Sequence, residues 1–153
     1  RKVRATLSGW TSAQQRPTVA LAEFVPRRVS RRELKELATA GLVTVHAAAG
    51  GARLSGDDAV ILECWAQFKE AGLDQDQGLS PTDLRLYDEA MERLVAREAR
   101  MVLRVRGGAP AEELSRMIEQ ISPVTERLLG AMHRKRIRQF IAEVGDGEEP
   151  SQA

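Results

Sequence analysis

The stretch that decides the fold is "VPRRVSRRELKELATAGLV", which runs from Val25 to Val43. Ser30 followed three residues later by Glu33 is the signature of a capping box at a helix N-terminus. Leu34 and Leu37 follow on its apolar side. The stretch therefore predicts a short amphipathic helix over residues 30–40.

The same helix start carries an unusual density of positive charge. Arg27, Arg28, Arg31 and Arg32 surround it, although cations there oppose the helix dipole by roughly 0.3 kcal/mol or more each. An anionic partner at this helix end gives the cluster a purpose, because backbone N–H groups at a helix start also favour anions. The alternative is a solvated basic surface whose cations pair with nearby acids: Glu23, Glu33 and Glu36.

Composition allows one domain, or two very small ones, with a local basic surface. The chain has 153 residues, of which 42% are hydrophobic and 29% charged, and its net charge is only +1. Residues 1–40 hold nine Lys/Arg against three Asp/Glu, a net of +6, whereas residues 41–80 hold two against six, a net of −4. This asymmetry indicates one surface that faces a polyanion, rather than a protein that is basic throughout.

Cysteine content and hydropathy favour the cytoplasm. Cys64 is the single cysteine, so no disulfide framework exists, and its apolar neighbours predict an inert core thiol. No apolar run has the length of a membrane span, and no signal peptide is visible. The chain starts at Arg1 rather than Met, so we expect a fragment whose upstream part is missing.

Residue periodicity predicts a mainly helical chain. We expect a helix over 18–25 ended by Pro26, then the helix over 30–40, and a hairpin whose strands are 42–46 and 52–54. A helix starting after Ser55 and closing at Gly72 follows. The signal "SPTD" at residues 80–83 predicts a long helix that reaches about Arg106. A further helical region starts at Pro110, and Pro123 should kink or split it.

Three segments in this order resemble the MerR-type transcriptional regulators. "VSRRELKELATAGLV" (29–43) is similar to their second helix, "GARLSGDDAV" (51–60) to their wing and next helix start, and "ILECWAQFKEAGL" (61–73) to their third helix. The long helix from Pro81 falls where that family places its dimerisation helix. "LRLYDEAMERLVAREA" looks like the C-terminal region of certain actinobacterial members, so the resemblance covers roughly residues 18–106.

The resemblance implies a mainly α fold, a degenerate winged helix-turn-helix of helices plus one small β-hairpin, followed by a long helix and a C-terminal helical bundle. The expected parts are a linker or arm at 1–16, the winged domain at 17–72, a dimerisation or effector region at 80–144 and a disordered tail at 145–153. It implies a homodimer that binds DNA under the control of an effector. The residues expected to contact DNA are Arg27, Arg28, Arg31, Arg32, Lys35 and, on the wing, Arg53.

Departures from the family support an alternative. Lys35, Glu36 and Leu37 stand where the family has Arg-Tyr-Tyr, and Ala52 and Ser55 replace its wing aromatics. The alternative is a helical ligand- or protein-binding module of a regulator whose DNA-reading domain lies upstream. A small apolar or aromatic effector would contact large or flexible apolar side chains, unless these form an ordinary core: Trp65, Phe68, Tyr87, Met91, Met117 and Met132.

Catalysis has little support in the sequence. His46 and His133 lie far apart, with no nucleophile motif or third partner. Asp74, Asp76 and Asp83 do not follow the spacing of a calcium loop. We therefore expect no enzyme activity, no cofactor and no metal site.

Overall fold

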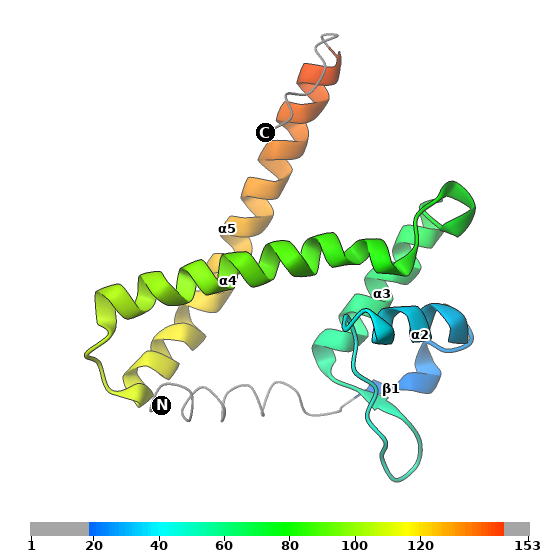
Figure 1. Cartoon of the computed structure of the whole chain (residues 1–153), viewed down its shortest axis with the longest axis horizontal. Coiled ribbons are helices and arrows are strands. Elements are labelled where there is room, and N and C mark those ends of the chain that lie inside the picture. The colour runs from blue at the N-terminus through cyan, green and yellow to red at the C-terminus, as the bar shows by residue number, and fades with distance from the viewer. Residues whose placement is uncertain (1–18, 146–153) are drawn as a thin grey trace. The chain divides into compact units, whose positions relative to one another are not determined.

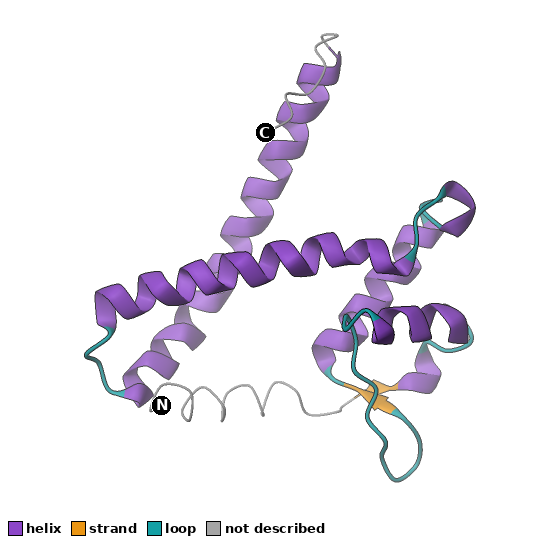
Figure 2. Cartoon of the chain, viewed as in Figure 1, coloured by secondary structure: helices purple, strands orange, loops and turns teal. Residues whose placement is uncertain are grey.

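The computed structural model describes residues 19–145 and is mainly α-helical, with one small two-stranded antiparallel sheet (Figures 1 and 2). The mainly α prediction is confirmed, while the winged arrangement stays a prediction. The arm expected at 1–16 and the tail beyond residue 145 lie outside the described residues. The elements are β1 Val19–Ala20, η1 Leu21–Glu23, α2 Arg31–Thr39, β2 Arg53–Leu54, α3 Gly56–Glu70, η2 Gln75–Gln77, η3 Pro81–Leu84, α4 Arg85–Arg106 and α5 Ala111–Gly145.

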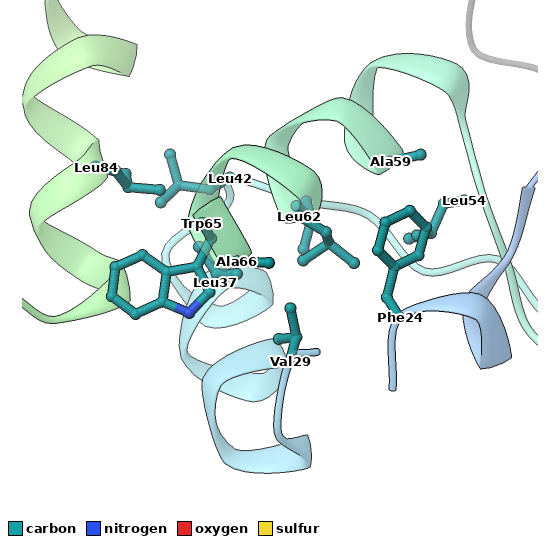
Figure 3. Packing of buried hydrophobic residues seen from close by; sticks show 11 residues of the cluster. Phe24, Val29, Leu37, Leu42, Leu54, Ala59, Leu62, Trp65, Ala66 and Leu84 are labelled. Carbon is teal, nitrogen blue, oxygen red and sulfur yellow. The ribbon is translucent and has the colours of Figure 1, made fainter. Parts of the chain in front are cut away.

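The chain divides into two compact units after Gly108, and the first contains a well-packed core. Side chains from the turn before α2, from α2, β2 and α3 meet there, and η3 adds Leu84 at its edge (Figure 3). Aliphatic residues and one tryptophan dominate this core, since the chain has few aromatics. The largest fully buried side chains are Trp65, Leu37, Leu54, Leu62, Val29 and Pro81.

The sheet joins residues that the sequence did not pair. Val19 lies opposite Leu54, and Ala20 lies opposite Arg53. The predicted hairpin is wrong in extent, because only His46 bridges to Arg53 and the main partner of β2 is β1. Figure 2 shows the loop that leads into β2 extending beyond this small sheet.

The helix predicted over residues 18–25 is also wrong. Val19 and Ala20 are extended against β2, and only the single 3-10 turn η1 follows them. Two physical causes combine here. Pairing with β2 takes the first residues, and Pro26 has no N–H with which to continue a helical hydrogen-bond series.

Two local start signals and one helix end are confirmed. The Ser55 hydroxyl accepts a hydrogen bond from the Asp58 N–H at 3.1 Å, which caps α3. Ser80 and Asp83 form a capping box before the turn that leads into α4, and α4 ends at Arg106 as predicted.

The prediction that Cys64 is a core thiol is wrong, because its side chain is exposed. Leu62, Trp65 and Ala66 occupy the side of α3 that faces the core.

The second unit contains one helix, α5, in its described part, and the bundle expected over residues 80–144 stays a prediction. α5 continues as one helix of 35 residues through Pro123, so of the predicted kink or split the split is wrong. Proline removes one helical hydrogen bond, but its fixed φ is compatible with a helix. The adjacent Ser122 hydroxyl donates to the Ile118 carbonyl at 2.8 Å. No helix within residues 19–145 combines the length and apolarity needed to cross a bilayer.

Candidate nucleic-acid interface

The helix α2 is fixed at its start by the predicted capping box. The Glu33 N–H donates to Ser30 Oγ at 3.1 Å, and the Ser30 N–H donates to Glu33 Oε2 at 2.6 Å. Leu37, one turn further on, is fully buried and anchors the inner side of the helix. Arg31 and Lys35 therefore lie on the opposite, outward side, because they follow each other at i, i+4 and are far from Leu37 around the helix.

Glu33 also connects α2 to α3. Its side chain is only 10% exposed and accepts hydrogen bonds from the Trp65 indole at 3.0 Å and from the Lys69 ammonium at 3.1 Å. Burial raises the pKa of the Glu33 carboxyl, but the hydrogen bonds from Ser30, Lys69 and Trp65 outweigh it and leave the pKa below its ordinary value. Glu33 is therefore a charged residue that holds the core together, which the capping motif alone did not reveal.

Arg28 is occupied within the fold. Its guanidinium forms ion pairs with Glu63 and, at 3.1 Å, with Glu70, both on α3. Its carbonyl accepts a hydrogen bond from the Lys69 ammonium at 2.8 Å. The hydrogen bond from Arg28 lowers the pKa of the Glu63 carboxyl. Arg28 thus holds the turn before α2 onto α3. It was predicted to contact DNA, but its guanidinium is already paired, so it is not part of the candidate interface.

The other cations around the start of α2 face solvent. Arg27, Arg31 and Lys35 are exposed and form no ion pair with any residue of 19–145. Arg32 pairs with Glu36 at 2.9 Å, but its side chain remains 78% exposed, so the pair is easily exchanged for another anion. The alternative pairing with neighbouring acids thus holds for Arg32 and not for the other three.

Arg53 lies in β2 and is half-buried. Its backbone N–H and carbonyl both bond to His46 at 2.9 Å, which fixes the base of the loop 47–52. This places Arg53 at the element that the sequence predicted to be a wing. The Leu21 N–H also donates to the Ala52 carbonyl at 2.9 Å, and within the loop the Gly51 N–H donates to the Ala48 carbonyl at 3.1 Å.

The six residues predicted to contact an effector are not brought together within either unit. Trp65 is fully buried and Phe68 packs against the core, so both belong to the ordinary core of the first unit. Tyr87 and Met91 are exposed on α4, at 47% and 43%. The remaining two, Met117 and Met132, lie on α5 in the second unit.

A different hollow is present between α2 and the connector that precedes α4. It has a volume of about 490 Å³, and none of the six predicted effector residues lines it. The Gln75 amide donates to Glu36 Oε2 at 3.1 Å at this place. The hollow is polar and shallow, lined by Arg32, Glu36, Gln75, Gly78, Leu79, Ser80 and Thr82.

Metal-binding geometry is not found in the described part of the chain. Among residues 19–145, no three His, Cys, Asp or Glu side chains lie close enough together to hold a metal ion.

In comparisons with known proteins, no family model matches the chain, and neither a curated protein nor a solved structure shows significant similarity to it.

Proposed function

We propose that this chain is a DNA-binding transcriptional regulator of MerR type that acts as a homodimer. The observation that carries the proposal is the outward side of α2. Arg31 and Lys35 on that side, and Arg27 in the turn before the helix, are exposed without an ion pair in the described residues. Arg28 and Glu33 hold the same helix on α3. A rigidly held helix start that presents unpaired cations is suited to phosphate contacts.

The positions of the acidic residues support a role of the exposed α2 cations in phosphate binding. The acids of residues 41–80 that contact the α2 region are used internally, since Glu63 and Glu70 pair with Arg28. The cations of the outward side are therefore not neutralised by the acidic segment that follows them. In a two-fold dimer, two such helices would meet successive major grooves, about 34 Å apart.

The alternative is a helical binding module without DNA contacts of its own. One observation favours it: the first helix of the expected helix-turn-helix is reduced to the single turn η1. Both candidate functions include a homodimer, and they differ in their dependence on salt. Phosphate contacts lose affinity steeply as salt rises, whereas an apolar protein interface does not.

The test is fluorescence anisotropy of the chain on a labelled random duplex, over a series of salt concentrations. The variant Arg27/Arg31/Lys35→Ala removes the three unpaired cations of the α2 side. If each contacts one phosphate, the slope of log affinity against log salt becomes shallower by roughly 2 to 3. The variant keeps Arg28 and Glu33, so the packing of α2 on α3 is unchanged.

A matched control is Arg93/Arg97/Arg100→Ala on α4. These three arginines are also exposed and form no ion pair within residues 19–145, so the control removes the same charge from another place. We expect the control to retain most of the binding and of the salt slope. Equal losses in both variants would contradict a specific role for α2, and no binding by the parent chain would favour the binding module.

A further inference from the structure

An exposed apolar stripe runs along the middle of α5. Ile121, Val124, Leu128 and Met132 follow each other at intervals of three, four and four residues, so they share one side of the helix. Their exposed fractions are 40%, 54%, 57% and 54%. Four large apolar side chains in one row, each about half exposed, are the pattern of a helix that packs against a partner helix.

The charge of α5 changes sign at the middle of this stripe. Residues 111–126 contain four Glu and one Arg, a net of −3. Residues 127–145 contain four Arg and one Lys against one Glu, a net of +4 with His133 neutral. The change falls between Glu126 and Arg127, and the midpoint of the stripe from Ile121 to Met132 falls at the same place.

Because the charge changes sign at the midpoint of the apolar stripe, the best partner for α5 is a second α5 that runs antiparallel to it. A second α5 that runs antiparallel brings each acidic half beside a basic half, and it aligns the two stripes about their common midpoint. A parallel pair would bring five cations beside five cations, which is unfavourable. The antiparallel pair is also self-complementary, as a two-fold interface between identical chains requires.

We infer that α5 is a self-association helix that pairs antiparallel with α5 of a second copy, centred between residues 126 and 127. Ile121 of one copy then lies beside Met132 of the other. The inference rests on the homodimer included in the proposed function, but it needs no DNA. It also assigns the dimer contact to α5, whereas the resemblance to MerR-type regulators predicts it on the helix 81–106.

The first test is disulfide crosslinking in a Cys64→Ser background, which removes the only cysteine of the chain. One chain carries Ile121→Cys, and a second, mass-tagged chain carries Met132→Cys. Residues 121 and 132 are separated by about 16 Å along a helix, and a disulfide requires Cα atoms within about 7 Å. We therefore expect a crosslink only in the mixture. Crosslinks of each chain with itself would show a parallel pair, and a complete lack of crosslinks would remove α5 as the contact; either overturns the inference.

The second test measures dimer dissociation by analytical ultracentrifugation without DNA. Leu128→Glu places a charge in the stripe and should raise the dimer dissociation constant at least about tenfold. The matched control is Ile137→Glu, because residue 137 lies nine positions, or two and a half turns, further on and therefore on the opposite side of α5. Both side chains are exposed, so neither change disturbs a buried core. Equal effects of the two changes, or a monomeric parent chain, would refute the inference.

These tests fail separately from those of the proposed function. A chain that crosslinks as expected but shows no salt-dependent binding to duplex DNA keeps the α5 pair and loses the DNA-binding role. A chain that binds DNA but forms no crosslink keeps the DNA-binding role, and its dimer contact must be sought elsewhere.

Discussion

Replacing Glu33 by glutamine should destabilise the first unit, because the Glu33 side chain is only 10% exposed and connects α2 to α3. Glu33 accepts hydrogen bonds from Ser30, Trp65 and Lys69 with its two carboxylate oxygens. An amide has only one oxygen. Its NH₂ group must therefore face a donor, either the Trp65 indole or the Ser30 N–H.

The magnitude follows from the environment of each partner. A buried donor left without an acceptor costs about 1–3 kcal/mol. The Lys69 side chain is 26% exposed, so its ammonium recovers solvent and the lost ion pair adds only about 1 kcal/mol. Glu33→Gln should thus lower the free energy of unfolding by about 2–4 kcal/mol.

The assay is urea unfolding followed by the fluorescence of Trp65, which is fully buried in the folded state. Trp10→Phe removes the other tryptophan of the chain, so that the signal comes from the core. Glu36→Gln is the matched control, because its ion pair with the exposed Arg32 contributes only about 0.3–0.5 kcal/mol. Equal unfolding midpoints for the Glu33 and Glu36 variants would refute the role assigned to Glu33.

Three further outcomes are expected. The carboxyls of Glu33 and Glu63 have folded-state pKa values below their ordinary 4.5. The stability that these carboxylates contribute is therefore present above that pH and is lost as the pH falls through the folded-state pKa values. Urea midpoints measured down to pH about 3 should decline, and the decline should be weaker in Glu33→Gln. Leu62→Ala, at a fully buried position, should lower the free energy of unfolding by about 2–5 kcal/mol in the same assay. Pro123→Ala should stabilise α5 by up to about 3 kcal/mol, seen as slower amide hydrogen exchange along the helix.

The features that sequence predicted well are governed by neighbouring residues. The boxes at Ser30 and Ser80 and the cap at Ser55 need only a hydroxyl and an acid three positions later, so their outcome is local. The end of α4 at Arg106 follows from Gly107 and Gly108 in the same way. Such signals act within one helical turn and do not depend on the rest of the fold.

The features that sequence missed depend on distant partners. Arg28 and Glu63 are 35 residues apart, and nothing in the run of arginines distinguishes Arg28 from Arg27. Likewise, β2 lies between two partners: β1, more than 30 residues away in sequence, pairs with both Arg53 and Leu54, whereas the nearby His46 bridges only to Arg53. The candidate DNA contacts could therefore be found as a cluster, but their division into structural and solvent-facing members required the tertiary structure.

The short ladder between β1 and β2 has a mechanical consequence. Val19 is held to Leu54, which is locked in the core, and Ala20 is held to Arg53, which bridges to His46. Tension applied to the backbone ahead of Val19 therefore passes into the base of the loop 47–52 before it reaches α2 or α3. The Leu21 N–H extends the contact by donating to the Ala52 carbonyl at 2.9 Å, so β2 couples the strand β1 to both the loop 47–52 and the core.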